Sequence, residues 1–224
     1  AVFGLPLEFA RRIVAAGGSA GFASYTMAEA AAVPLVIRHF PFNPEVVKIV
    51  ADEFAADAGV DVLLHARTTG ARLDGGRVAG ITVHHVGGHD AFSAEAVVDA
   101  TGDAVVAHGA GVPMLEDEEH RQPNTLCFRL SNVDVQQFRA LGRNFKRERV
   151  LAGIERGELY WQSISFVSTP AGTDAICLMS RIVGRNSLDF VDASEQERIG
   201  RAQIKSIVGF LRREIPGFEN AILC

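Results

Sequence analysis

The segment from Ala96 to Val106, AVVDATGDAVV, constrains the fold of this chain more than any other stretch. A short apolar run stops at a glycine-containing turn, Thr101-Gly102-Asp103, and a second apolar run follows. This pattern predicts a strand buried on both faces up to Ala100, a tight corner, and a helix that begins at Ala104 with Asp103 as its cap. Gly102 has no Cβ, so a ligand can approach the backbone there. Such corners also occur as purely structural turns, and both interpretations stay open.

The residues before this corner predict a helix, a short strand and a hairpin. Asn43-Pro44-Glu45 offers a capping side chain, a proline at the first helical position and an acid in the first turn. It predicts a helix over 43–58 that ends at Gly59. The apolar run DVLLH at 61–65 predicts a buried strand, and Asp74-Gly75-Gly76 predicts the turn before a strand over 77–86.

This order of elements resembles the middle of one family. The segments that carry the resemblance are helix 43–58, the run AGVDVLLHARTTG, the hairpin LDGGRVAGITVHH and the closing VVDATGDAVVAHGAGVP. They are similar to FAD-dependent oxidoreductases with a glutathione-reductase-type FAD domain. GLPLEFARRI near the start, RQPNTLCFRL after the corner and FLRREIPGFENA near the end extend the resemblance over nearly the whole chain. The resemblance implies FAD as cofactor and cofactor contacts at Ala100, Thr101, Gly102 and Asp103.

Position 68 departs from the family pattern. Related flavoproteins usually have valine where this chain has Thr68, and the backbone groups of that valine contact the adenine of the cofactor. Valine and threonine are both β-branched and favour an extended backbone, so a backbone contact survives the exchange. The resemblance therefore implies Thr68 as a further cofactor contact, and the alternative is a strand end that only feeds the hairpin.

The glycine-rich phosphate loop of these flavoproteins, G-x-G-x-x-G, has no counterpart in the 224 residues. We therefore expect an internal segment of a larger flavoprotein that lacks the N-terminal loop and the C-terminal flavin-binding part. Alone it should bind FAD poorly and be inactive. The expected activity of the parent protein is hydride transfer between a small organic substrate and the flavin. A non-catalytic ligand-binding or assembly module with the same fold is the alternative, and an NAD(P)-linked dehydrogenase would need the same missing loop.

The chain after Pro113 changes character. Glu116 to His120, EDEEH, reads as a linker, because consecutive residues rarely face one metal ion. From Asn124 the pattern predicts strands over 125–130, 160–168 and 174–182, with helices over 136–141 and 145–153 and a hairpin turn over 169–173. The resemblance implies that this antiparallel sheet caps the flavin and carries substrate specificity.

These elements give an α/β fold class that becomes α+β in the second half: part of an FAD/NAD(P)-binding Rossmann-like domain with an antiparallel substrate cap. We divide the chain into a partial FAD-binding domain over 1–115, with a substrate-side insertion at about 17–42, and a cap domain over 116–190. An amphipathic helix and the start of a return strand follow over 191–224. Residues 23–37 are ambiguous between helix and strand, because Val33-Pro34 interrupts a helical pattern.

Arg129 stands among apolar residues of the strand predicted over 125–130. Pointing inward, its guanidinium could hold a carboxylate substrate through two parallel hydrogen bonds. The alternation of the apolar residues Leu126, Phe128 and Leu130 favours the outward orientation.

The helix predicted over 192–213 has the clearest pattern in the chain. Ser194 and Glu197 match a capping box, and Arg212-Arg213 suit the negative end of the helix dipole. The predicted buried stripe consists of Ile204, Ile207, Val208 and Leu211. The last residues, 221–224, resemble the beginning of a strand that has lost its partner.

Charge and composition limit the partners. A net charge of -5 and a pI of about 5.8 argue against nucleic acid, which needs a concentrated positive surface. The sequence has no secretory signal and no apolar stretch that could span a membrane. Cys127, Cys177 and Cys224 fit neither a disulfide framework nor a zinc site, which favours a reducing compartment, the cytoplasm. We expect a small-molecule substrate, and the oligomeric state cannot be read from the sequence.

No set of residues predicts a nucleophile with its base, so catalytic residues stay unassigned. His84 and His85 are consecutive in a predicted strand and point to opposite faces. In flavoenzymes the cofactor carries the difficult chemistry, so this absence is compatible with an oxidoreductase.

Overall fold

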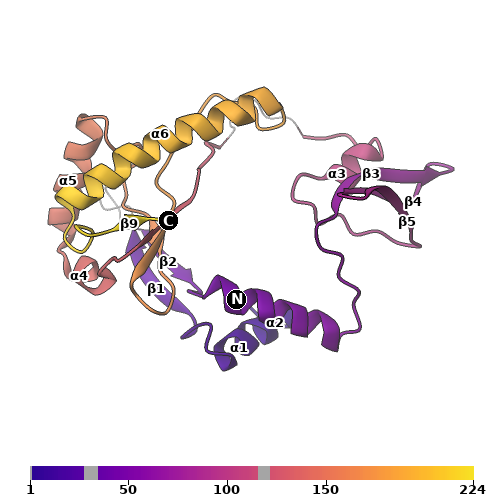
Figure 1. Ribbon diagram of the computed structural model, residues 1–224, viewed down its shortest axis with the longest axis horizontal. Coiled ribbons are helices and arrows are strands. Elements are labelled where there is room, and N and C mark those ends of the chain that lie inside the picture. The colour runs from indigo at the N-terminus through magenta and orange to yellow at the C-terminus, as the bar shows by residue number, and fades with distance from the viewer. Residues whose placement is uncertain (1, 28–34, 116–121) are drawn as a thin grey trace. The chain divides into compact units, whose positions relative to one another are not determined.

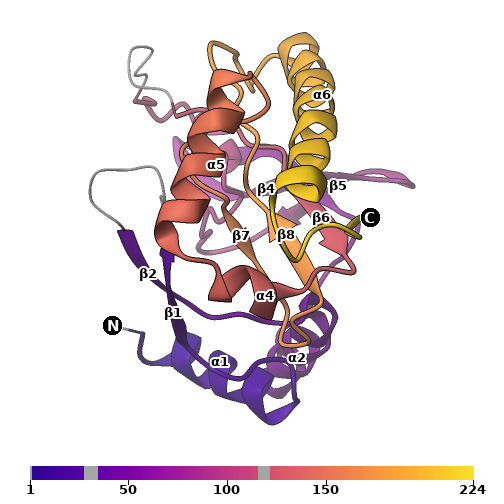
Figure 2. The same cartoon turned by 90° about the vertical axis from the view of Figure 1, so that its left-hand side faces the viewer.

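The computed structural model describes residues 2–27, 35–115 and 122–224, drawn from two directions in Figures 1 and 2. They form two compact units: residues 1–54 together with 122–224 make unit 1, and residues 55–121 make unit 2. One junction of the two units, between 121 and 122, lies close to the boundary expected near 116, and another falls between 54 and 55. No junction falls near the boundary expected at 191, because the long helix 190–214 shares one core with the strands of the predicted cap. The acidic run 116–120, predicted to be a linker, lies outside the described residues.

Unit 1 contains an antiparallel four-stranded sheet in the order β7-β8-β6-β9 and a separate antiparallel pair, β1-β2. The pair β1-β2 shows that the ambiguous segment 23–37 is extended at both ends. The elements are α1 (Leu5–Ala15), β1 (Ala23–Met27), β2 (Leu35–His39), α2 (Pro44–Asp57, whose last turn belongs to unit 2), β6 (Phe128–Ser131), α4 (Val135–Ala140), α5 (Arg143–Glu155), β7 (Phe166–Val167), β8 (Asp174–Cys177), α6 (Phe190–Glu214) and β9 (Ile222–Leu223).

The core of unit 1 lies between the four-stranded sheet and its helices. Leu130 of β6, Val150 of α5 and Phe210 of α6 are all fully buried in one apolar cluster. Helices α5 and α6 lie side by side (Figure 2), and a Cβ added at Gly153 of α5 would stand 2.7 Å from the Phe210 ring. The absence of a side chain at Gly153 therefore allows the two helices to approach closely.

The predicted strands of this sheet are present but shorter than expected. The predicted hairpin is confirmed: β7 pairs with β8 across the turn 169–173, and Asp174 Oδ1 accepts hydrogen bonds from the Thr169 amide at 3.0 Å and its hydroxyl at 2.6 Å. The expectation that the last strand lacks a partner is wrong, because β9 pairs antiparallel with β6. A sequence pattern identifies a strand but not a partner more than ninety residues away.

Helix α2 begins and ends as predicted. The Asn43 side chain accepts a hydrogen bond from the Glu45 amide at 3.0 Å, and Gly59, with φ 67°, follows the last turn. The turn that follows α1 packs on this helix, since a Cβ at Gly18 would lie 2.5 Å from Val46 Cγ1.

Unit 2 is built on a three-stranded antiparallel meander of β3 (Arg67–Asp74), β4 (Arg77–His85) and β5 (Gly88–Ser93), followed by the short helix α3 (Val105–Gly109). The predicted turn at Gly75 and Gly76 is confirmed, with both glycines at positive φ. Strand β5 approaches β4 so closely that a Cβ at Gly80 would stand 2.0 Å from the Phe92 carbonyl oxygen.

Two segments of unit 2 that were predicted to be buried strands are not strands. Residues 61–65 and 96–100 have no strand pairing, and Leu64 and Val98 are 69% and 89% exposed. A short apolar run satisfies the pattern of a buried strand wherever it occurs, whereas a strand also needs a neighbour to receive its backbone hydrogen bonds. Within unit 2 the meander pairs its three strands with one another, and these two runs remain outside it.

The predicted α/β class agrees with this mixture of helices and sheets. Every strand pair in the described ranges is antiparallel. No helix among the described residues is long and apolar enough to cross a membrane.

Candidate functional site

The corner predicted to bind a cofactor is an exposed loop of unit 2 that leads into α3. Gly102 has φ 84°, and a Cβ built on it would meet nothing within 4 Å, so the backbone here faces open space. Thr101 is half-buried, and Ala100 and Asp103 are exposed. The positive φ explains why glycine stands at this position.

A carboxylate that the sequence analysis did not single out holds this loop together. Asp99 Oδ1 accepts hydrogen bonds from the Thr101 hydroxyl at 2.7 Å and the Thr101 amide at 3.1 Å. Its Oδ2 accepts from the amides of Val106 at 3.0 Å and Ala107 at 2.9 Å. The Thr101 hydroxyl oxygen in turn accepts from the Val105 amide at 3.0 Å. Asp99 and Thr101 together therefore cap α3.

The predicted cap, Asp103, is wrong in this role. The N-cap position is Ala104, in the left-handed region with φ 52°, and no side chain at that position caps the helix. Hydrogen bonds from the Ala107 amide and then from Thr101 lower the pKa of Asp99 below its ordinary value of 3.8. Asp99 is therefore a carboxylate at neutral pH, and the capping network is complete without Asp103.

Thr68 lies in β3, opposite Val83 of β4, beside a shift in register between Thr68 and Gly70. Helix α3 packs on this same strand, and a Cβ at Gly109 would stand 3.0 Å from the Ala71 amide nitrogen. The structure thus places Thr68 on the strand that the helix of the corner contacts. It also shows the strand feeding the hairpin, as the alternative interpretation expected.

Arg129, the predicted substrate residue, lies in β6 of unit 1 and points outward, the orientation that the alternation favoured. Its side chain is 54% exposed, and Nη2 lies 3.3 Å from Oδ2 of the buried Asp174. Asp174 already binds Thr169 through Oδ1, so Arg129 supplies the charge that faces its other oxygen. The guanidinium therefore has a structural partner in place.

No group of three or more histidine, cysteine, aspartate or glutamate side chains in the described part of the chain is arranged to hold a metal ion. His84 and His85 point to opposite faces of β4: the His84 ring contacts the His89 ring in a tilted arrangement with centroids 4.7 Å apart, and His85 Nε2 lies 2.8 Å from Asp90. Each histidine therefore has a local cross-strand partner.

Together these features define an α/β protein with an exposed glycine corner on one of its units. A family model described as FAD dependent oxidoreductase matches residues 1–224, and the chain belongs to that family. The resemblance read from the sequence is confirmed, and FAD is the cofactor of the family. Neither the curated proteins nor the solved structures with which the chain was compared give a match.

The corner fits one part of FAD and not another. The diphosphate needs amide or cationic donors, but the amides of Val105, Val106 and Ala107 are already bound by Thr101 and Asp99, and the Asp99 carboxylate would repel phosphate. A sugar or sugar-alcohol hydroxyl needs an acceptor, and Asp103 offers an exposed carboxylate with no hydrogen-bond partner in the described ranges. The open backbone at Gly102 leaves room for such a group.

Proposed function

We propose that this chain is part of an oxidoreductase in which a hydride passes between a small organic substrate and FAD. The observation that carries the proposal is the family match over residues 1–224. When bound, FAD supplies the acceptor or donor of the hydride, and the protein supplies binding, orientation and electrostatics. In keeping with the family, we propose a Rossmann-like setting for the FAD-binding segment.

In this proposal the corner binds the hydroxylated part of the cofactor. Asp103 accepts hydrogen bonds from cofactor hydroxyls, while the backbone from Ala100 to Gly102 lies against it. Thr101 keeps its place through Asp99, because its hydroxyl is committed to the cap. Thr68 contributes backbone groups from β3, at the point where the register shifts.

We further propose that the sheet β7-β8-β6-β9 and its helices form the substrate cap. A substrate role for Arg129 within this cap requires a carboxylate that competes with Asp174. If Arg129→Ala leaves the substrate dependence of the complete enzyme unchanged, Arg129 has no such role.

The isolated chain should bind FAD weakly and have no activity, because its 224 residues contain no G-x-G-x-x-G and the first amides of α3 are occupied. The test is a visible absorption spectrum of the purified chain after incubation with FAD and removal of free cofactor. We expect no retained flavin band and no reduction of an electron acceptor when flavin is added. Retained flavin or turnover would contradict this part of the proposal.

The second candidate is a non-catalytic ligand-binding or assembly module that keeps the fold. The saturated amides at α3 favour it, since they leave the diphosphate without donors at this corner. The gene upstream of Ala1 separates the two candidates: a strand followed by G-x-G-x-x-G supports the flavoenzyme, and its absence supports the module.

The proposed cellular setting is the cytoplasm, with a small molecule as partner and neither nucleic acid nor membrane. The support is the net charge of -5 and the presence of three free cysteines. Binding of the chain to a polyanion column at physiological ionic strength would contradict the proposal that nucleic acid is not a partner.

A further inference from the structure

Unit 1 contains a cavity of about 310 Å³ beside β7 and β8. Its wall is largely apolar, with Ile37, Phe166 and Leu178 among the lining residues, and Trp161 and Arg181 also line it. A volume of this size is at the lower end of the range for small-molecule sites.

Arg181 differs from the arginines that form ion pairs in this unit. Its guanidinium lies over the Trp161 ring, 4.3 Å from the ring centroid, and no carboxylate in the described ranges forms an ion pair with it. The Gln203 side chain fixes its backbone: Gln203 Oε1 accepts from the Arg181 amide at 2.7 Å, and Nε2 donates to the Arg181 carbonyl at 2.9 Å. A guanidinium has five N–H donors, and a position over a ring leaves some of them for an anion.

Ser165 provides a second polar group at this cavity. It is 6% exposed, and its Oγ has no hydrogen-bond partner among the residues that the structure describes. The other lining hydroxyls are occupied: Ser180 Oγ bonds the amide and carbonyl of Leu126 at 2.7 and 3.1 Å, and Thr125 donates to the Ser180 carbonyl at 3.2 Å. A buried hydroxyl without a partner lowers stability, and rotation about its Cα–Cβ bond can present it to a ligand in the cavity.

We propose that this cavity binds a small organic carboxylate with an apolar body. Arg181 receives the carboxylate through two parallel hydrogen bonds, Ser165 donates a third, and Phe166 and Leu178 contact the apolar body. A phosphate ester is disfavoured, because a dianion needs more donors than one guanidinium and one hydroxyl can provide. The site lies within unit 1 and does not depend on flavin binding.

The chain contains one tryptophan, Trp161, so its fluorescence reports directly on this cavity. Cyclohexanecarboxylate is a suitable probe because it does not absorb where tryptophan is excited, and cyclohexanecarboxamide is its uncharged counterpart. We expect a saturable change in emission with the carboxylate and a much weaker response to the amide. Equal responses to both probes, or no saturable response to the carboxylate, would overturn the proposal.

Arg181→Gln tests the charge, with affinity measured by calorimetry so that the altered stacking on Trp161 does not affect the readout. We expect binding of the carboxylate to weaken by about tenfold or more. Arg198→Gln is the matched control, because Arg198 lies on the surface of α6 and pairs with Glu195, and it should bind as tightly as the original chain. Equal weakening in both variants would overturn the assignment of Arg181.

Ser165→Ala separates binding from folding. Removing a buried hydroxyl without a partner should leave the melting temperature unchanged or raise it, while carboxylate binding weakens. Unchanged affinity with a folded protein would overturn the assignment of Ser165, and a chain that melts lower would show that its hydroxyl has a structural partner.

Discussion

At the scale of single residues, the corner depends on one carboxylate that stands before the motif. Asp99 accepts hydrogen bonds from two helix amides as well as from Thr101. Because the folded protein lowers the pKa of Asp99, the native state binds fewer protons than the unfolded chain around and below pH 3.8. The stabilisation is therefore complete above that value and is lost as the pH falls through the lowered pKa.

Asp99→Ala should release the first turn of α3, because the amides of Val106 and Ala107 lose their acceptor. Hydrogen exchange followed by NMR should show these two amides exchanging faster. Asp103→Ala is the control and should leave their exchange unchanged. If Asp103→Ala accelerates exchange and Asp99→Ala does not, the cap is the one predicted from the sequence.

The sequence predicted the turn here but not its cap, for a physical reason. The turn at Gly102 and the helix after it depend on neighbouring residues, and the structure contains both. Asp99 reaches amides seven and eight residues ahead because Ala104 turns the chain through the left-handed region, which a pattern of residue types does not reveal. Similarly, alternation indicated the outward orientation of Arg129, whereas its pairing with Asp174 depends on the register of β6 and β8.

At the scale of elements, α6 was the most predictable and still differs at its beginning. The predicted stripe of Ile204, Ile207, Val208 and Leu211 is buried. The helix begins at Phe190, and the side chain of the preceding Asp189 accepts hydrogen bonds from the amides of Val191 and Asp192. The predicted capping box is wrong, since Ser194 instead donates to the Phe190 carbonyl within the helix. The spacing of apolar residues predicts which face of a helix is buried. The residue at which the helix begins depends on which of several acidic side chains accepts hydrogen bonds from the amides of the first turn.

Two glycines of α6 should respond in opposite directions to alanine. A Cβ at Gly200 would stand 2.8 Å from Leu126 Cβ, so Gly200→Ala should lower the free energy of unfolding by about 1–3 kcal/mol. A Cβ at Gly209 meets nothing within 4 Å, so Gly209→Ala should raise it by about 0.5–1 kcal/mol. Urea unfolding of both variants measures the difference, and equal effects would contradict the packing described for Gly200.

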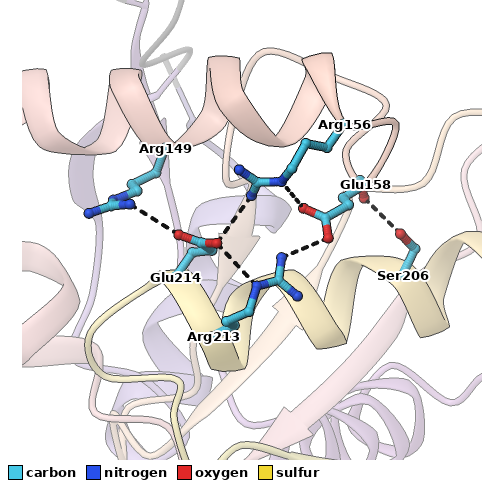
Figure 3. A network of polar contacts seen from close by, with 6 residues as sticks. All are labelled: Arg149, Arg156, Glu158, Ser206, Arg213 and Glu214. Carbon is cyan, nitrogen blue, oxygen red and sulfur yellow. Dashed lines mark hydrogen bonds and ion pairs between the residues drawn. The ribbon is translucent and has the colours of Figure 1, made fainter.

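A network of charges links α5 to α6 (Figure 3). Glu158 accepts from Arg156 Nε and Arg213 Nη2, both at 2.7 Å. Glu214 accepts from Arg149, Arg156 and Arg213, each at 3.1 Å. The arginines, led by Arg156, lower the pKa of Glu158 below its ordinary value of 4.5, and the two glutamates raise the pKa of Arg213.

Glu158→Gln should make the melting temperature less sensitive to acid. Because the pKa of Glu158 is lowered in the folded protein, the ionised side chain stabilises the fold fully at pH values above its ordinary pKa of 4.5. This stabilisation is lost as the pH falls through the lowered pKa. On acidification the melting temperature of the original chain should therefore fall further than that of the variant. The difference should be modest, because the network is partly exposed. Glu195→Gln, at an exposed pair on α6, is the control and should retain the full acid dependence. Parallel curves for Glu158→Gln and the original chain would contradict the role of Glu158.

At the scale of the whole chain, the two units differ in how much core they contain. Unit 1 has one large apolar cluster, whereas Val83 and Val106 are the buried apolar residues of unit 2 in the described ranges. The sequence pattern predicted a boundary near the acidic run 116–120. It did not predict that residues 1–54 form one unit with residues 122–224. Such long-range grouping is decided by contacts between distant segments, which residue composition does not encode.

The three cysteines report on the integrity of unit 1. Cys127 and Cys224 are exposed and Cys177 is fully buried. Burial, aided by repulsion from Cys127, raises the pKa of Cys177 to about 12, so its thiolate form is scarce at neutral pH. Maleimide should label Cys127 and Cys224 in the folded chain and reach Cys177 only after denaturation, as mass spectrometry of the digested protein would show. Rapid labelling of Cys177 under native conditions would contradict the described core.

The edges of the four-stranded sheet of unit 1 influence how readily the chain self-associates. Its outer strands, β7 and β9, have two residues each, so its edges offer few free backbone groups as a template for another molecule. Unit 2 instead exposes three consecutive apolar side chains, Val62, Leu63 and Leu64. We therefore expect self-association of the purified chain to begin at this run, and solubility to improve when charge is added there.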